Sequence, residues 1–384
     1  MSAKTTLILG GGLGGLTAAH HLRMLAPHDH RIVVVEQKET FSLCMSNLWL
    51  MTGERQTPEE AERPMSGLEQ KGIEWLRGEV QTVDPKTRTV RTSAGSLDAD
   101  YLIVALGAER NPGAVPGFAE GAHNLYDAEG AQHIRRALAG FSGSRIVVLI
   151  SRTPFSCPAA PYEAAFLIED VLRKRGVRER TEIAVYTPED LPMPVAGPIV
   201  GESLVQMLRE HGIEFHSEQI VLKIDAANRR ILFEIDETSY DLLVGVPPHA
   251  APQVARESGL VDATGWIPVD QGTLETRHPG VFAIGDVTAI RLPNGMFLPK
   301  AGVFADGQAH SVAEKIAADV GGGSEPPRFN GHGFCYIEVG NGMAAYGSGN
   351  FYALAGPSVT LEEASQRFRK EKEGIEKIAL AVLE

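Results

Sequence analysis

The sequence predicts an α/β protein with two Rossmann-like dinucleotide-binding domains and a small C-terminal module. Three observations lead to this prediction. Residues 5–36 have the pattern of a strand, a glycine-rich turn, a helix and a second strand, and residues 145–187 repeat the strand, helix, strand order. A stretch rich in glycine and proline, 321–327, then separates the terminal segment from the rest of the chain.

Composition limits the possible classes of protein. The chain has 384 residues, of which 43% are hydrophobic and 22% charged, so it can bury large cores in two or three domains. The formal net charge of -13, with no basic block, argues against a nucleic-acid partner. The first strand starts too early for a signal peptide, and no apolar run reaches the roughly 18 residues of a spanning helix. The expected location is therefore the cytoplasm.

The first strand, 5–9, leads into a dinucleotide-binding fingerprint. Gly10, Gly12 and Gly15 satisfy GxGxxG, in which the glycines allow a tight turn, contact between backbone and pyrophosphate, and close helix packing. Glu36 ends the second strand, where an acceptor for a ribose hydroxyl belongs. A purely structural glycine turn is the alternative, and the ordered strand, helix, strand and acid argue against it.

Two later strands indicate that the first domain is discontinuous. The strand 101–107 ends at Gly107, and the strand 281–286 ends in Gly285 and Asp286. Each could be a simple exit from a strand into a loop. Together with the fingerprint they predict a cofactor domain built from residues 1–110 and 245–330, with Asp286 facing the crevice at the carboxyl ends of the strands.

The second domain, 111–244, lacks the glycine fingerprint of an NAD site. Its first strand, 145–150, runs into a segment with Cys157 among prolines, followed by Glu163 at the expected start of the next helix. No run of glycines lets the backbone approach a pyrophosphate there, so NADH is disfavoured as electron donor. Cys335, in the predicted terminal module 331–384, completes a possible redox pair with Cys157.

The tail has an apolar stripe at helical spacing between residues 361 and 383. We expect this helix to pack on its own domain. A shallow, weak attachment to a membrane surface is the alternative for the same pattern.

Three segments in order carry a family resemblance: Cys157-Pro-Ala-Ala-Pro-Tyr-Glu163, Leu298-Pro-Lys300-Ala-Gly302 and Cys335-Tyr-Ile-Glu-Val-Gly340, after the N-terminal fingerprint. With them the chain resembles the group of sulfide:quinone oxidoreductases and flavocytochrome c sulfide dehydrogenase flavoproteins, among the two-dinucleotide-binding-domain flavoproteins. The resemblance implies bound FAD and oxidation of sulfide to sulfane sulfur or polysulfide.

The resemblance also implies roles for four residues. Cys157 and Cys335 would form a redox-active disulfide that sulfide attacks, leaving a persulfide on one sulfur and a thiolate on the other. Two unrelated buried thiols are the alternative; the prolines around Cys157 and the Gly-His-Gly before Cys335 argue against burial in regular structure. Glu163 would handle protons, although a carboxylate in a first helical turn is also stabilised by the helix dipole. Lys300 would stabilise negative charge on the reduced flavin, with a solvated surface lysine as the alternative.

Cys44 resembles the position at which flavocytochrome sulfide dehydrogenases attach FAD through a thioether. A noncovalent flavin packed near Cys44 is the other possibility, and the sequence does not separate the two. Quinone-reducing members often have a further cysteine before the Cys157 segment, whereas residues 122–127 contain none. This difference argues against growth of long polysulfides on a third thiol.

The electron acceptor stays open between a quinone, which we expect, and a cytochrome on a separate subunit, because the chain has no CxxCH motif for haem. A type II NADH:quinone oxidoreductase and a flavin-based redox sensor are further alternatives. No histidine pattern indicates a metal site. A peripheral position on the cytoplasmic face of a membrane and a homo-oligomer are also left open. The aromatic candidates for a quinone slot are Phe334, Tyr336, Phe351 and Tyr352.

Overall fold

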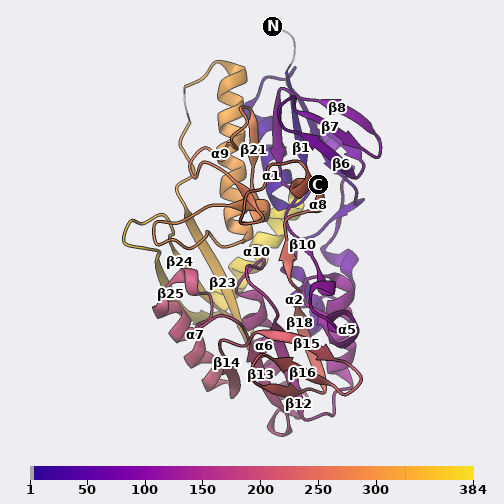
Figure 1. Cartoon of the computed structure of the whole chain (residues 1–384), viewed down its shortest axis with the longest axis vertical. Helices are drawn as coiled ribbons and strands as arrows, with labels where there is room; N and C mark the ends of the chain where they lie inside the picture. The colour runs from indigo at the N-terminus through magenta and orange to yellow at the C-terminus, as the bar shows by residue number, and fades with distance from the viewer. Residues whose placement is uncertain (1–3, 325) are drawn as a thin grey trace.

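The structure, a computed structural model, describes residues 4–324 and 326–384. Residues 1–3 of the predicted first domain and residue 325 of the breaker-rich stretch lie outside the described residues. The α/β class is confirmed, with two parallel sheets of Rossmann type and several smaller antiparallel sheets. In Figure 1 the first parallel sheet lies in the upper half of the molecule and the second in the lower half.

The first sheet has five parallel strands in the order β21-β9-β1-β2-β5. The strands are β1 (Thr5–Leu9), β2 (Arg31–Glu36), β5 (Glu74–Arg77), β9 (Tyr101–Val104) and β21 (Val281–Ala283). Residues 6–9 of the central strand are buried, as expected for a parallel sheet covered on both faces. Because β21 pairs with β9, the sheet is built from two separated parts of the chain. The boundaries 1–110, 245–330, 111–244 and 331–384 stay predictions.

The second sheet is also parallel, in the order β11-β18-β12-β13-β14. Its strands are β11 (His123–Asn124), β12 (Arg145–Ile150), β13 (Glu182–Tyr186), β14 (Ile213–His216) and β18 (Leu242–Val246). The order reverses at β12, and the carboxyl ends of β12 and β13 point toward the first sheet's half of the molecule. In such sheets ligands bind outside the carboxyl ends of the strands.

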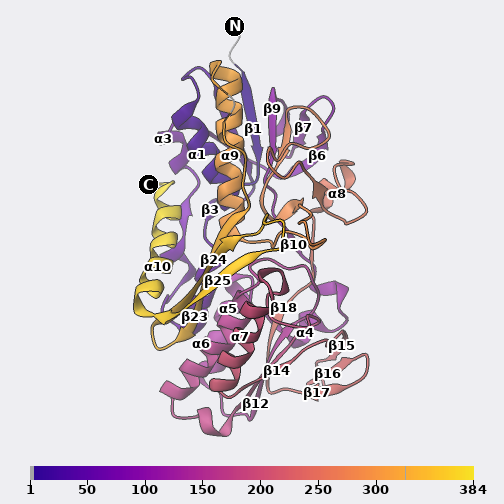
Figure 2. The same cartoon turned by 90° about the vertical axis from the view of Figure 1, so that its left-hand side faces the viewer.

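Ten α-helices occur among the described residues. They are α1 (Leu13–Leu25), α2 (Ser46–Thr52), α3 (Gly67–Gln70), α4 (Phe118–Gly121), α5 (Ala128–Ala139), α6 (Ala160–Lys174), α7 (Pro198–Glu210), α8 (Gln253–Glu257), α9 (Gly302–Gly321) and α10 (Gln366–Ala381). Helices α1 and α9 lie side by side in Figure 2. Both helices carry fully buried alanines, among them Ala19 and Ala313, and Gly14 of α1 lies against Ala305 of α9, so small residues let the two backbones approach closely.

The remaining strands form antiparallel sheets and pairs. Three sheets of three strands are β6 (Val80–Asp84) with β7 (Thr89–Thr92) and β8 (Gly95–Asp98), β15 (Val221–Asp225) with β16 (Arg230–Phe233) and β17 (Glu237–Ser239), and β23 (His332–Gly340) with β24 (Met343–Asn350) and β25 (Ser358–Ser365). Three pairs are β3 (Thr40–Phe41) with β4 (Arg63–Pro64), β10 (Glu109–Arg110) with β19 (His249–Ala250), and β20 (Ile267–Pro268) with β22 (Thr288–Ala289). The pair β10 and β19 lies where the chain leaves the first predicted domain and returns to it.

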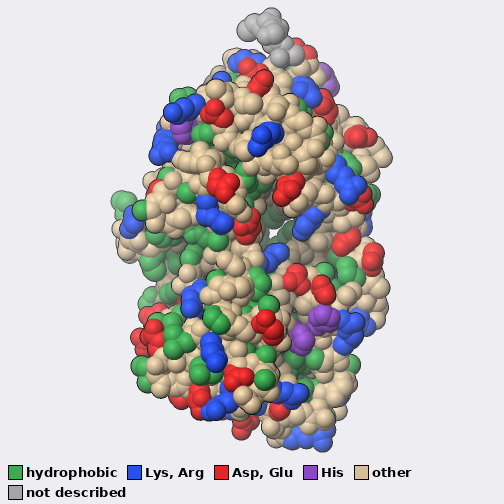
Figure 3. Space-filling model, turned by 45° about the vertical axis from the view of Figure 1, so that its right-hand side comes forward, with side chains coloured by type: hydrophobic (Ala, Val, Ile, Leu, Met, Phe, Trp, Pro, Cys, Tyr) green, Lys and Arg blue, Asp and Glu red, His purple; other side chains and the backbone are tan. Residues whose placement is uncertain are grey.

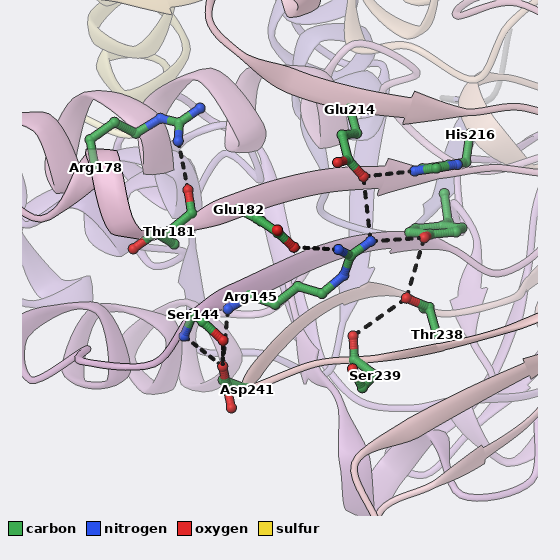
Figure 4. Close-up of polar contacts among 11 residues, drawn as sticks. Ser144, Arg145, Arg178, Thr181, Glu182, Glu214, His216, Thr238, Ser239 and Asp241 are labelled. Atoms are coloured by element: carbon green, nitrogen blue, oxygen red, sulfur yellow. Dashed lines mark hydrogen bonds and ion pairs between the residues drawn. The ribbon is translucent and has the colours of Figure 1, made fainter.

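A cluster of charged side chains ties the second sheet together at the starts of its strands (Figure 4). The Arg145 guanidinium on β12 donates to Glu182 on β13 at 2.5 Å and lies 3.4 Å from Glu214 on β14. Asp241 accepts hydrogen bonds from the backbone N–H groups of Ser144 and Arg145 at 2.7 and 3.0 Å. These contacts lie at the opposite end of the strands from the site described below, so their role is structural.

The tail differs in part from the helix predicted for residues 361–383. Residues 358–365 form strand β25, and α10 begins at Gln366, where the Ser365 side chain caps it by accepting from the N–H of Phe368 at 3.3 Å. Strand β25 continues the β23–β24 sheet, and these backbone hydrogen bonds outweigh the local helical pattern. Helix α10 packs on the protein itself: Phe368 stacks on Tyr346 of β24, and Leu380 is buried in the core of the first sheet, although Ile378 is 74% exposed. The prediction that it packs on its own domain alone is therefore not met.

Helix α10 also buries charged residues. Lys372, only 4% exposed, forms ion pairs with Glu163 on α6 and, at 2.9 Å, with Glu338 on β23. Arg369 pairs with the other oxygen of Glu338 at 2.6 Å. Taking such charges out of water is costly, and each is compensated only by its partners. The network therefore fixes the tail against both α6 and β23.

We predict that Lys372→Met destabilises the protein by about 3–5 kcal/mol, because it leaves two buried carboxylates facing each other without their shared cation. Urea denaturation followed by circular dichroism would measure the loss. Lys370→Met is the matched control: Lys370 is exposed on the same helix, so its replacement should change stability by less than about 0.5 kcal/mol. Equal effects of the two substitutions would contradict the role given to the network.

Candidate functional site

The glycine-rich turn after β1 is open to a ligand on one side only. Gly10 has φ +103°, and a Cβ there would lie 2.4 Å from the Ala105 carbonyl oxygen; a Cβ on Gly15 would lie 2.0 Å from the oxygen of Gly10. These two glycines are required by the fold. Gly12 precedes α1, and a Cβ there would meet no atom within 4 Å. The space beside Gly12 at the helix N-terminus fits a pyrophosphate, which helix dipoles and free N–H groups favour.

Glu36 lies beside the same turn, at the end of β2. Its carboxylate accepts hydrogen bonds from the backbone N–H groups of Gly11 at 2.8 Å and Lys38 at 2.9 Å. The side chain is half-buried, so the carboxylate is held in place while keeping room for a further donor such as a ribose hydroxyl. Gly107, after β9, has φ +66° in the left-handed region that favours glycine.

Gly285 and Asp286 follow β21 at the same edge of the sheet. Gly285 has φ +72°, and its N–H donates to the Gln308 side chain at 2.6 Å. The Asp286 carboxylate accepts a hydrogen bond at 2.5 Å from Ser156, the residue before Cys157. This contact joins the first parallel sheet to the loop after β12, and no sequence pattern identified Ser156 as a site residue.

Lys300 is a buried residue, 7% exposed, and not a solvated surface lysine. Its ammonium group donates to the carbonyl oxygens of Asp286 at 2.6 Å and Thr288 at 3.2 Å, and lies 3.3 Å from the centre of the Trp266 ring. Burial lowers the pKa of Lys300 to about 8, and Asp286 opposes that shift. The Lys300 carbonyl also accepts from the N–H of Cys157 at 2.6 Å. The lysine thus connects the loop of Cys157 to the first sheet.

Cys157 and Cys335 lie in the wall of one cavity of about 670 Å³. Cys157, with φ +49°, stands in the loop between β12 and α6, and Cys335 lies within strand β23 opposite Gly347. The expectation that Cys335 lies outside regular structure is wrong, because the ladder with β24 runs through it. Both thiols are free. Burial raises the pKa of Cys335 to about 12 and that of Cys157 well above its usual range, so both are protonated at neutral pH.

The cavity is lined mainly by apolar side chains from both halves of the molecule and from the antiparallel sheet. In Figure 3 the surface is hollowed between the two halves. Of the four aromatic candidates, Phe334 and Phe351 line the cavity. Tyr336 instead packs against Phe368, and Tyr352 against Phe329.

Glu163 is buried near the two cysteines and outside the cavity wall. It occupies the first turn of α6, as predicted, is 2% exposed, and accepts from the N–H of Glu338 at 2.9 Å besides pairing with Lys372. Burial raises the pKa of Glu163, and the Lys372 ammonium opposes that rise. Its charge acts on both thiols, raising the pKa of each. In the described part of the chain, Glu163 is not among the residues that line the cavity.

Cys44 lies between the two halves, in the space beside Arg110, Tyr126 and His249 that we call the cleft. Its sulfur is 3.8 Å from the Tyr126 carbonyl oxygen and 3.9 Å from the Arg110 guanidinium. The surrounding protein raises the pKa of Cys44, and Arg110 opposes that shift. The hydroxyl of Tyr126 donates to the Ser156 carbonyl at 2.7 Å, so this tyrosine spans from Cys44 to the loop of Cys157.

His249 provides a further sign that the cleft holds a ligand. Its Nδ1 lies 2.8 Å from the Pro247 carbonyl oxygen, and its ring packs edge-on against Tyr126. Its Nε2 is buried and has no hydrogen-bond partner among the described residues. Burial lowers the pKa of His249 to about 4, so the ring is neutral. The His249 Nε2 without a hydrogen-bond partner and the free space at Gly12 both fit a bound dinucleotide.

Two negative findings hold for residues 4–324 and 326–384. No group of three or more His, Cys, Asp or Glu side chains is arranged to hold a metal ion. No helix there combines the length and the apolar character needed to cross a bilayer.

The chain is similar to several quinone-linked oxidoreductases. The sulfide:quinone oxidoreductase of Mus musculus is 27% identical over 302 residues, a match that covers 73% of this chain and 65% of the relative, just under two thirds. The sulfide-quinone reductase of Aquifex aeolicus is 26% identical and covers 83% of this chain and 77% of the relative. A type II NADH:quinone oxidoreductase of Staphylococcus haemolyticus is 25% identical and covers 82% of each.

Comparison with solved structures shows the same fold. The crystal structure of the sulfide:quinone oxidoreductase from Aquifex aeolicus superposes with a TM-score of 0.88, covering 99% of this chain and 92% of the other at 22% identity. The family described as pyridine nucleotide-disulphide oxidoreductase matches residues 4–308. The resemblance to sulfide:quinone oxidoreductases is thereby confirmed, and the chain belongs to the pyridine nucleotide-disulphide oxidoreductase family.

Proposed function

We propose that this protein oxidises sulfide to sulfane sulfur through Cys157 and Cys335 and passes the electrons by way of FAD to a quinone. The observation that carries the proposal is the presence of both thiols in the wall of one largely apolar cavity, although they come from distant parts of the chain. The relatives named as sulfide:quinone oxidoreductases support it.

FAD would be held in the cleft by the turn at Gly10, Gly12 and Gly15, by Glu36, and at the strand ends by Gly107, Gly285 and Asp286. Bound there, FAD would supply the two-electron redox chemistry between the cysteine pair and the acceptor. Lys300 supplies positive charge beside this edge of the sheet. Its pKa of about 8 keeps it largely protonated at neutral pH.

The chemistry assigned to the cysteines begins from their oxidised, disulfide-bonded form. Hydrosulfide attacks one sulfur of the bridge, forming a persulfide on that cysteine and releasing the other as a thiolate. The sulfide sulfur loses two electrons, and a quinone finally gains two electrons and two protons to become a quinol.

NADH is a weaker candidate for the donor, despite the similarity to type II NADH:quinone oxidoreductases. In the second sheet, the loop after β12 contains Pro154, Cys157 and Pro158 where a nicotinamide site carries glycines. A proline has no N–H to offer a phosphate. The loop is also tied to Lys300 and Asp286, so it does not have the open backbone of a phosphate-binding turn.

A peripheral position on a membrane would bring a quinone to the protein. Large apolar side chains are exposed close to the cavity: Met296 and Phe297 line it, and Ile199 stands on α7 just after the cavity residues 193–196. Leu354, in the turn between β24 and β25, is 93% exposed. We infer that this rim, and not α10, faces the membrane surface.

Cys157→Ser and Cys335→Ser should each lower the rate of flavin reduction by sulfide by at least about 10³-fold, because either change removes the disulfide. Anaerobic stopped-flow absorbance of the flavin measures this rate. Dithionite should still bleach the flavin of both variants, which controls for folding and cofactor content. Reduction by sulfide at the wild-type rate in both variants would rule out the cysteine mechanism.

The acceptor can be tested on the sulfide-reduced protein. When the reduced protein is mixed with a short-chain ubiquinone analogue, we expect the oxidised flavin spectrum to return at a rate that rises with quinone concentration. A cytochrome c that reoxidises the flavin faster than the quinone would instead favour the flavocytochrome alternative. A reduced flavin that neither acceptor reoxidises would favour a redox sensor.

We further propose that FAD is attached covalently to Cys44, because this thiol lies in the cofactor cleft beside Arg110 and Tyr126. Acid precipitation should then leave yellow flavin in the wild-type pellet and release it into the supernatant from Cys44→Ser. Mass spectrometry of the intact wild-type chain should show the added mass of FAD. Complete release of flavin from the wild type would show that the cofactor is held noncovalently.

A further inference from the structure

Glu189 is a titratable residue that faces the cavity and has no part in the proposal above. Three carboxylates line the cavity: Glu189, Asp190 and Glu218. Asp190 and Glu218 are exposed at its edge, whereas Glu189 is half-buried. A carboxylate turned into a mainly apolar cavity is costly to keep charged, so its presence calls for a chemical reason.

The position of Glu189 in the fold is informative. It follows β13, the second strand of the β12, α6, β13 unit, where a dinucleotide-binding domain places the acid that binds a ribose. In the first sheet Glu36 holds that place and bonds the glycine-rich turn. The loop after β12 lacks such a turn and carries Cys157 instead. Glu189 therefore has no nucleotide to bind, and it faces the cavity of the cysteine pair.

The side chain of Glu189 is held in a defined position. Its Oε2 accepts hydrogen bonds from the Tyr162 hydroxyl on α6 at 2.8 Å and from the Thr187 hydroxyl at 3.2 Å. Its backbone carbonyl accepts from the N–H of Glu218 at 3.0 Å. Tyr162 is fully buried and directly precedes Glu163. One oxygen of the carboxylate is thus anchored, which orients the other for a different partner.

The surroundings of Glu189 bring the pKa of its carboxyl group into the neutral range. Burial raises the pKa of Glu189 to about 7, the two hydroxyl groups of Tyr162 and Thr187 oppose that rise, and the charge of Asp190 adds to it. A general base works best when its pKa is close to the working pH. Hydrogen sulfide also loses its first proton in the neutral range, so the proton can move between the two at little cost.

We propose that Glu189 takes the proton from hydrogen sulfide inside the cavity and so generates the hydrosulfide that attacks the cysteine pair. This inference rests on the proposed function. An apolar cavity admits neutral hydrogen sulfide more readily than the hydrosulfide anion, but the anion is the nucleophile. The proton passes to the carboxylate of Glu189, and the hydrosulfide forms a persulfide as its attack releases one cysteine as thiolate. Glu163, behind the cysteines, remains paired with Lys372.

The test is the pH dependence of flavin reduction by sulfide. The wild-type rate constant should pass through a maximum near neutral pH, because it requires ionised Glu189 and neutral hydrogen sulfide together. In Glu189→Gln it should fall by about 10² or more at neutral pH and rise steadily toward alkaline pH, where the solvent supplies the anion. Glu218→Gln, an exposed carboxylate on the same cavity, should keep the wild-type profile within about twofold.

Tyr162→Phe provides a second variant that keeps the carboxylate. The tyrosine hydroxyl donates to the ionised form of Glu189 and so lowers its pKa; losing it raises the pKa. The acidic limb of the rate profile should therefore move to higher pH. Infrared difference spectra give a readout independent of turnover: a carboxylic acid band that titrates near pH 7 in the wild type should vanish in Glu189→Gln and shift upward in pH in Tyr162→Phe.

The outcomes separate this inference from the proposed function. If sulfide fails to reduce the wild-type flavin, the proposed function is wrong. If sulfide reduces it but Glu189→Gln keeps the wild-type rate and profile, only the role of Glu189 is overturned. Should Glu189→Gln lose its flavin, an unmoved acidic limb in Tyr162→Phe would overturn the role in the same way.

Discussion

The site depends on how the loop of Cys157 is tied to the first sheet. The N–H of Cys157 donates to the carbonyl of Lys300, and Ser156 donates to the Asp286 carboxylate. Lys300 in turn donates to backbone carbonyls after β21 and lies on the face of Trp266. These contacts link the carboxyl edges of two separate sheets. Through these contacts the Cys157 thiol, in the second sheet's half, is held in a fixed position relative to the glycine-rich turn of the first.

The C-terminal part of the chain, with strand β23 and helix α10, completes the site. Strand β23 brings Cys335 to the cavity, and the ion pairs of Lys372 and Arg369 hold helix α10 against α6 and β23. Burial of so many charges gains little net stability. It does, however, demand one arrangement of partners, because any shift of the helix leaves a charge unpaired. The position of Cys335 relative to Cys157 is thereby specified electrostatically as well as by packing.

Local sequence patterns predicted much of the fold correctly. The turn at residues 10–15, Glu36 and the first turn of α6 follow from short-range signals that tertiary contacts do not override. The sequence pattern predicted the wrong structure at two places. Residues 361–365 have helical spacing but form a strand, because they pair with β24. Cys335 was expected in a loop because of the glycines before it, but it lies within strand β23. Trp266 and His249 were missed because only chain folding brings them to the cleft. Glu189 had a signal, an acid just after the second strand of a βαβ unit.

That signal bears on how this fold would take a different electron donor under the proposed function. A dinucleotide site needs N–H groups free to bind phosphate and an acid for the ribose. Here prolines and a cysteine occupy the loop, its backbone is bonded to Lys300, and mainly apolar side chains line the cavity beside it. The acid that remains is Glu189, shielded from water and bonded by Tyr162. In the role we propose, an acid placed like a ribose-binding carboxylate exchanges protons with a small neutral substrate, because burial is the largest cause of its raised pKa.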